Sequence, residues 1–164
     1  LKTKRELLQQ IKQDNLVVVS DATSCTQGLT QIFAETKIDI VDVLEFVNKQ
    51  VLSKLNIKTR LSSLALHPTC SGVELNINQN MKDIAEMISI RVVIPDDWAC
   101  CGFAGDRGLL HPGLTASATK KESEELNNEI FAAYASSNRP CQQALSQATG
   151  QNYVHLIELV DRVS

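Results

Sequence analysis

Short apolar runs alternate with amphipathic segments along most of this 164-residue chain. The clearest run is 16–20, where Val17, Val18 and Val19 follow one another as in a strand buried on both faces. Further strands are expected at 38–40, 62–66, 91–95 and 129–135, and helices at 2–14, 26–36, 41–55, 80–90, 114–128, 141–149 and 154–163. The segment 129–135 also suits a continuation of the helix before it, but a strand is favoured. This alternation predicts an α/β fold with a mainly parallel sheet flanked by helices.

The cysteines share one position relative to this pattern. Cys25, Cys70 and the adjacent pair Cys100 and Cys101 follow the carboxyl ends of expected strands, and Cys141 does so if 129–135 is a strand. That edge of a parallel sheet is where ligands bind. Each cysteine is also expected near a helix N-terminus, where free backbone N–H groups favour thiolate. Free cysteine is also common as an ordinary buried core residue. That interpretation accounts for one or two of the five cysteines, but it explains poorly why all five lie at one edge.

The adjacent pair Cys100 and Cys101 lies in a glycine-rich stretch, 98–108. Neighbouring cysteines do not readily form a relaxed disulfide, but a turn can present both thiolates to one point. Gly102 and Gly105 allow the backbone to pass close to a bound group. Soft sulfur ligands of this kind select iron–sulfur clusters or zinc.

Three further polar residues lie beside the cysteine motifs. Asp106 and Arg107 suit either a contact to a neighbouring cofactor or domain, or a surface salt bridge. The position of His67 fits a hydrogen-bond donor to cluster sulfur or a metal ligand. The interpretation that we favour is a structural histidine, hydrogen-bonded at the end of a strand. His155 is expected to be exposed on the last helix.

Composition excludes several classes of protein. A net charge of −3 provides no basic field for nucleic acid. Five cysteines, an odd number, argue against a disulfide scaffold and favour a reducing compartment with free or metal-bound thiols. No dinucleotide-binding glycine fingerprint is present. Thiol–disulfide catalysis is disfavoured because the chain has no Cys-x-x-Cys.

The chain contains an internal echo. The seven residues from Cys25 resemble the seven from Cys141, and 44–47 resemble 157–160 after a three-residue difference in spacing. We interpret this as a duplication, with residues 1–58 the last part of a truncated first repeat and 59–164 a second repeat, packed as one unit. Because the first repeat lacks its own double cysteine and the chain starts at Leu1, we expect a fragment of a longer protein.

Three motifs stand out, namely His67-Pro68-x-Cys70, Cys100-Cys101-Gly102-x-Ala104-Gly105 and Cys141. Together they resemble the cysteine-rich, or CCG, domain family, which occurs in heterodisulfide reductases, in the glycolate oxidase iron–sulfur subunit and in anaerobic glycerol-3-phosphate dehydrogenases. The longer stretches 100–108 and 111–119, with 21–26 and 137–141, are similar to the C-terminal region of large FAD-linked D-lactate dehydrogenases that carry iron–sulfur clusters. The resemblance covers residues 17–163.

This resemblance implies an electron-transfer module of a flavin-dependent D-lactate, or 2-hydroxy acid, dehydrogenase, inactive by itself. It implies an iron–sulfur cluster held by Cys25, Cys70, Cys100, Cys101 and Cys141. It also implies FAD-binding and ferredoxin-like domains elsewhere in the parent chain, and a quinone or cytochrome as electron acceptor. The implied location is the cytoplasm, either free or attached to the surface of the inner membrane. The alternatives are a zinc-stabilised or metal-free domain that docks the flavin domain, and a redox module like that of heterodisulfide reductase.

The sequence departs from the family at one point. Family repeats often end in Cys-x-x-Cys, but Gly28 and Ala144 stand where the second cysteine would be. The resemblance therefore leaves the type of cluster open.

Overall fold

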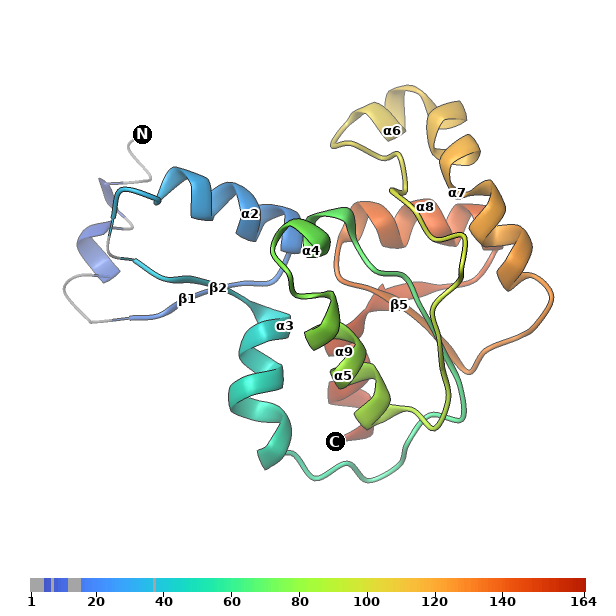
Figure 1. Cartoon of the computed structure of the whole chain (residues 1–164), viewed down its shortest axis with the longest axis horizontal. Coiled ribbons are helices and arrows are strands. Elements are labelled where there is room, and N and C mark those ends of the chain that lie inside the picture. The colour runs from blue at the N-terminus through green and yellow to red at the C-terminus, as the bar shows by residue number, and fades with distance from the viewer. Residues whose placement is uncertain (1–4, 7, 12–15, 37) are drawn as a thin grey trace.

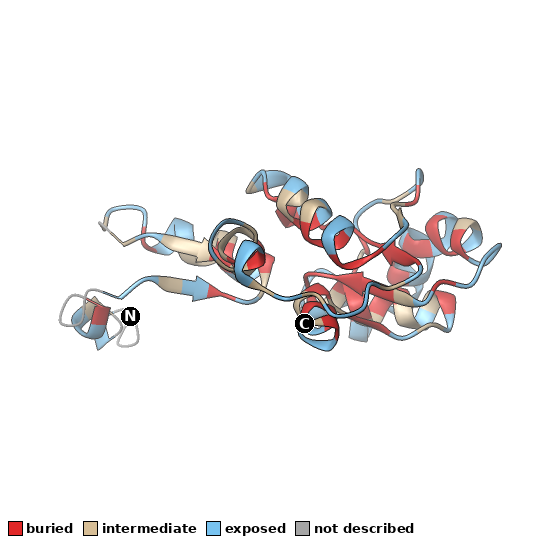
Figure 2. Cartoon of the chain, turned by 90° about the horizontal axis from the view of Figure 1, so that it is seen from below, coloured by how far each residue is buried: buried red, intermediate tan, exposed pale blue. Residues whose placement is uncertain are grey.

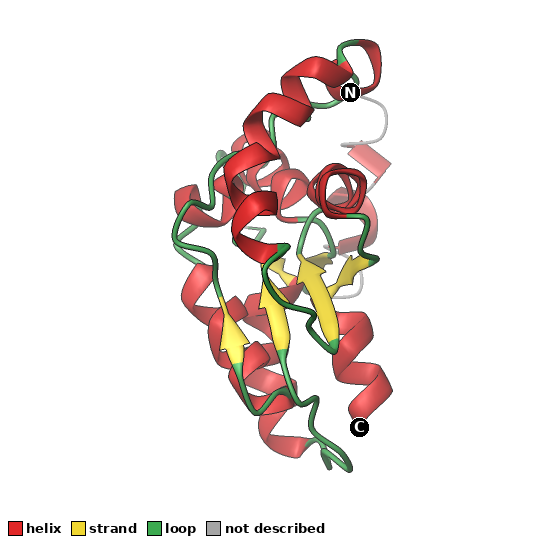
Figure 3. Ribbon diagram, turned by 90° about the vertical axis from the view of Figure 1, so that its right-hand side faces the viewer, coloured by secondary structure: helices red, strands yellow, loops and turns green. Residues whose placement is uncertain are grey.

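The computed structural model describes residues 5–6, 8–11, 16–36 and 38–164. Its centre is a four-stranded sheet in the order β4 (Val92–Val93), β3 (Leu64–Leu66), β5 (Ala133–Ser136) and β6 (Tyr153–His155). All three strand pairs are parallel, so the carboxyl ends meet at one edge (Figure 3). The predicted α/β class is confirmed, and a strand, β5, overlaps the end of the segment 129–135.

Helices cover both faces of this sheet, because alternate residues of its strands point to opposite sides. Leu64 and Leu66 of β3 face a core shared with α5 (Asn78–Ile88) and α9 (Leu156–Val163). Ala65, between them, faces a second core that holds Leu126 of α7 (Pro112–Leu126) and Leu145 of α8 (Arg139–Thr149). α7 and α8 also pack against each other (Figure 1). The central strand is therefore buried on both sides, as its unbroken apolar sequence predicts.

A smaller parallel sheet lies to one side of the four-stranded sheet. It pairs β1 (Val18–Ser20) with β2 (Ile40–Asp42), connected by α2 (Thr23–Ile32). A continuous helical segment follows as α3 (Val43–Phe46), a π-helical turn (Val47–Val51) and a 3₁₀ turn (Leu52–Lys54). Buried residues concentrate over the larger sheet, whereas β1 and β2 are largely half-buried or exposed (Figure 2).

The two halves of the echo have the same order of elements. β1, α2, β2 and α3 correspond to β5, α8, β6 and α9, and Cys25 and Cys141 are each the third residue of their helix. Asp42 and His155 end the corresponding strands, and each accepts a hydrogen bond from the backbone N–H two residues on. These correspondences support the proposed duplication, while the repeat boundary near residue 58 stays a prediction.

The structure differs from the sequence prediction in three elements. The last helix begins at Leu156, because Tyr153 to His155 form the strand β6, which the sequence did not indicate. Two short helices, α4 (Cys70–Glu74) and α6 (Arg107–Leu110), were also not predicted. In the predicted helix 2–14, residues 5–6 and 8–11 are helical and the rest lies outside the described residues. None of the helices in the described ranges is long and apolar enough to cross a membrane.

Candidate functional site

Four cysteines from three separate segments gather at the carboxyl edge of the larger sheet. The Sγ atoms of Cys101 and Cys141 lie 3.1 Å apart, and both side chains are buried. Cys70 and Cys100 form a second, exposed pair, in which burial and the neighbouring Cys100 raise the pKa of Cys70. The pairs are close enough to interact electrostatically, because the charges of Cys70, Cys100 and Cys101 all raise the pKa of Cys141. The structure thus brings together four of the five cysteines that the sequence singled out, and their role as ligands stays a prediction.

Local structure fixes the two cysteines that begin helices. Cys70 opens α4 directly after Thr69, whose hydroxyl accepts a hydrogen bond of 3.1 Å from the Gly72 N–H. A Cβ at Gly72 would lie 2.1 Å from the side-chain oxygen of Asn78, so a larger residue there would displace the Asn78 side chain. Cys141 lies in the first turn of α8. Both thiols thus lie near free helical N–H groups, as predicted.

The adjacent pair lies in a loop, not at a helix N-terminus, so that part of the prediction is wrong. The next helix, α6, begins only at Arg107. The chain reverses instead through Gly102 and Gly105, at φ 69° and 70°, and Ala104, at φ 44°. In the left-handed region a non-glycine residue is disfavoured. The loop therefore depends on the glycines that the sequence singled out.

Cys101 carries an acidic thiol. Its pKa falls to about 6, chiefly through its hydrogen bond with the Cys141 thiol. The Phe103 backbone N–H and the nearby charge of His67 also lower the pKa, against the opposing effect of burial. The pKa of Cys141 is raised in turn by its hydrogen bond to Cys101 and by burial, and that of Cys70 by burial and Cys100. The geometry therefore favours a thiolate at Cys101 near neutral pH.

His67 lies beside this group and is fixed by a residue that the sequence did not suggest. Its Nδ1 lies 2.8 and 2.9 Å from the two carboxylate oxygens of Glu122 on α7. Both side chains are almost fully buried, and Trp98 meets the His67 ring edge-on at 6.3 Å. Glu122 lies seven residues after Thr115 and three after Thr119, so it shares their buried face of α7, which the sequence alone does not mark as buried. His67 is thus hydrogen-bonded at the strand end, as favoured, but through Nδ1 alone.

The remaining candidates are Cys25, Gly105, Asp106 and Arg107. No hydrogen bond within the described ranges joins Cys25 to another cysteine, although its helix is tied to the α8 region by the bond from Thr23 to Ser137. Gly105, Asp106 and Arg107 are exposed, and among the described residues no ion pair joins Asp106 to Arg107. Their predicted contact with a cofactor or domain stays a prediction.

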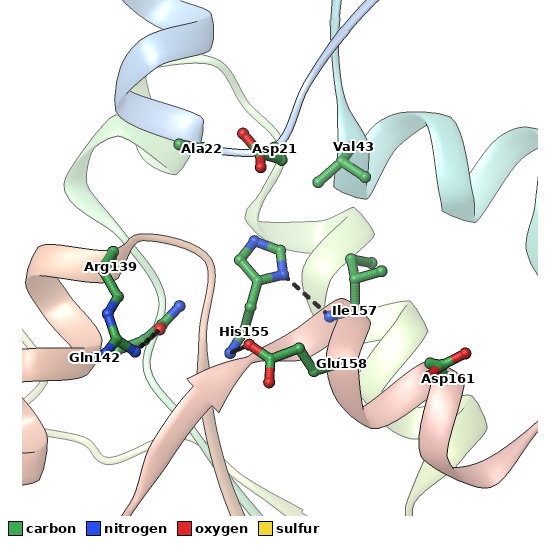
Figure 4. A pocket seen from close by; sticks show the side chains of 9 residues that line it. All are labelled: Asp21, Ala22, Val43, Arg139, Gln142, His155, Ile157, Glu158 and Asp161. Atoms are coloured by element: carbon green, nitrogen blue, oxygen red, sulfur yellow. Dashed lines mark hydrogen bonds between the residues drawn. The ribbon is translucent and has the colours of Figure 1, made fainter.

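A cavity of about 770 Å³ opens at the carboxyl ends of β1, β2 and β6, and no cysteine lines it (Figure 4). Its walls include Asp21, Arg139, His155 and Glu158. His155 ends β6 and is half-buried, so its predicted place on an exposed helical face is wrong. Its Nδ1 caps α9 by accepting the Ile157 N–H at 3.2 Å, and burial lowers its pKa.

The four thiols are arranged for a cofactor that binds cysteine sulfur at more than one metal atom. In the part of the chain that the structure describes, no three His, Cys, Asp or Glu side chains are arranged to hold a single metal ion. The four thiols form two separate pairs, and iron–sulfur clusters take cysteine thiolates at separate irons. The buried Nε2 of His67, which has no hydrogen-bond partner among the described residues, lies in the same region. These residues fit an iron–sulfur cluster.

Comparison with known proteins agrees with this donor set. The family model of the cysteine-rich domain, CCG, matches residues 64–146, which contain all four gathered thiols. The chain belongs to the cysteine-rich CCG domain family. It is also 28% identical over 127 residues to the glycolate oxidase iron–sulfur subunit of Escherichia coli (strain K12). That match covers 74% of this chain and 30% of the relative, so the chain corresponds to less than a third of the relative's length.

Proposed function

We propose that this CCG domain holds an iron–sulfur cluster and serves as the electron-transfer module of a flavin-dependent 2-hydroxy acid dehydrogenase. The observation that carries the proposal is the gathering of Cys70, Cys100, Cys101 and Cys141 at one sheet edge. Similarity to an iron–sulfur subunit of glycolate oxidase supports the same class of reaction.

The four thiols would hold the cluster, which when bound supplies one-electron transfer. Cys101 offers a preformed thiolate, and the Phe103 N–H stabilises that negative sulfur. Phe103 itself is buried against the Cys101 and Cys141 pair and excludes water from it. Cys70 and Cys100 lie at the exposed side, where electrons would enter or leave.

For the substrate we propose D-lactate, oxidised at an FAD domain that belongs to the same longer protein or to a partner subunit. The resemblance of 21–26, 100–108, 111–119 and 137–141 to D-lactate dehydrogenases supports this choice over glycolate. Electrons would pass through ferredoxin-like clusters and this domain to a quinone or cytochrome. Free thiols suit a reducing cytoplasm, and a quinone acceptor would place the protein at the inner membrane.

Anaerobic reconstitution of the full-length protein, followed by iron and sulfide analysis, tests the cluster. Cys101→Ser is expected to lose the iron and sulfide of this site, whereas Cys25→Ser, changed outside the thiol group, is expected to keep them. Zinc without sulfide in the wild type, or full iron retention in Cys101→Ser, contradicts the cluster assignment.

The substrate is tested separately in the loaded protein. D-lactate, L-lactate and glycolate are added in turn under anaerobic conditions, and bleaching of the cluster absorbance is followed. D-lactate is expected to bleach it fastest. Faster bleaching by glycolate would show that glycolate, and not D-lactate, is the substrate, and it would leave the cluster assignment unchanged.

A further inference from the structure

The buried pair of His67 and Glu122 has one polar atom left over. His67 is 1% exposed and Glu122 2% exposed, and both carboxylate oxygens of Glu122 lie against Nδ1. The Nε2 atom at the other side of the ring is buried and meets no hydrogen-bond partner within the described part of the chain. Buried polar atoms in native proteins nearly always have a partner, so this nitrogen points to a group that completes the site.

Three neighbours place the ring at the cysteine site. His67 stands three residues before Cys70, in the segment that leaves β3. Trp98, which packs edge-on against the ring, belongs to the loop that carries Cys100 and Cys101. The charge of His67 also contributes to the lowered pKa of the Cys101 thiol.

Glu122 is well placed to set the orientation of the ring. It projects from α7, the helix on which the Gly102 turn rests, since a Cβ at Gly102 would lie 2.8 Å from the Cβ of Ala118. A carboxylate accepts hydrogen bonds and cannot donate them, so Nδ1 carries a proton directed at Glu122. With Nδ1 held in this way, Nε2 is the ring atom left for the cysteine site.

We propose that Glu122 is a positioning residue that holds His67 as an imidazolium, so that its Nε2–H donates a hydrogen bond to a sulfur of the bound iron–sulfur cluster. This inference rests on the proposed cluster function. A donor to cluster sulfur stabilises the more negative, reduced state, because hydrogen bonds to the sulfurs are among the factors that set the reduction potential. The pair would therefore raise the midpoint potential of the cluster.

Four variants of the reconstituted full-length protein test the inference. His67→Leu removes the donor, His67→Gln keeps a side-chain N–H at a similar reach, and Glu122→Gln removes the negative charge behind the ring. Glu124→Gln is the matched control, because it removes an exposed carboxylate from the same helix. Iron content and the midpoint potential are measured for each, by redox titration with EPR detection.

The midpoint potential is expected to shift downward in His67→Leu, to shift less in Glu122→Gln, and to return toward the wild-type value in His67→Gln. Glu124→Gln is expected to match the wild type. An unchanged potential in His67→Leu, or a shift in His67→Gln as large as in His67→Leu, overturns the hydrogen-bond role.

EPR-based nitrogen hyperfine spectra of protein labelled with ¹⁵N-histidine separate a donor from a direct ligand. A weak coupling that disappears in His67→Leu supports the donor, and a strong coupling overturns it in favour of iron ligation. Loss of iron from both His67 variants and Glu122→Gln, with retention in Glu124→Gln, overturns it as well. A wild-type protein that takes up no iron or sulfide instead refutes the proposed function.

Discussion

Replacing Gly102 with alanine tests how tightly the double-cysteine loop is packed. Gly102 has φ 69°, and an added Cβ would lie 2.8 Å from the Cβ of Ala118 and 3.2 Å from the carbonyl oxygen of Leu114. The left-handed conformation costs an alanine about 1–2 kcal/mol. Forcing an extra methyl group into packed surroundings costs about 1–3 kcal/mol more. We therefore expect Gly102→Ala to lower the free energy of unfolding by about 2–5 kcal/mol.

Two other glycines separate these contributions. Gly105 has φ 70° but open space around the added methyl group, so Gly105→Ala should cost only the conformational part, about 1–2 kcal/mol. Gly28 lies within α2 with an ordinary φ and nothing near its Cβ position, so Gly28→Ala should stabilise by about 0.4–1 kcal/mol. Urea unfolding of the metal-free protein, followed by circular dichroism, gives all three values.

Comparing the unfolding free energies of the three variants separates the conformational cost from the packing cost. If Gly105→Ala is as destabilising as Gly102→Ala, backbone conformation explains the whole effect and the contact between the loop and α7 is unimportant. If Gly102→Ala leaves the unfolding free energy unchanged, the described position of the loop against Ala118 and Leu114 is wrong.

Three further predictions concern the rest of the fold. Burial lowers the pKa of His155 below its unfolded value of about 6.5, so the neutral ring stabilises the fold above that pH and this stabilisation is lost as the pH falls. His155→Asn keeps a capping side chain for the Ile157 N–H, and it should reduce the loss of unfolding free energy between about pH 7 and pH 5. A double-mutant cycle on the 2.9 Å hydrogen bond from Thr23 to Ser137 should give a coupling of about 0.5–1.5 kcal/mol, and zero coupling would show that the two sheets are not joined there. Leu145→Ala should cost about 2–5 kcal/mol in urea unfolding because the side chain is fully buried, and a value below about 1 kcal/mol would contradict its place in the core.

The fold class and the gathering of the thiols were predictable because both depend on local patterns. Apolar runs such as 62–66 indicate central strands, and parallel strands bring their carboxyl ends to one edge, which places Cys70, Cys101 and Cys141 together. The strand β6 was missed because its three residues run directly into an apolar helix. A strand that short is identified by its pairing with β5, and the partner lies outside any local window.

The partner of His67 was hidden for a different reason. Glu122 stands in the charged stretch 120–125, which has the composition of a solvent-facing helix. Only the packing of α7 against the sheet edge buries this one carboxylate while Glu124 stays exposed. The left-handed turn at Ala104 likewise has no signal in its own residue type, since alanine rarely adopts that conformation.

The spread of the four thiols along the chain also sets the order of events during synthesis. Cys141 follows Cys101 by 40 residues, and a ribosome adding about 5–20 residues per second needs about 2–8 s to cover that distance. Throughout that interval Cys70, Cys100 and Cys101 are already made, while the sulfur that lowers the pKa of Cys101 does not yet exist. Until Cys141 is added, the Cys101 thiol therefore lacks the hydrogen-bond partner that makes it acidic in the folded domain. A cluster held by all four thiols, as proposed above, could consequently be completed only after α8 has been made.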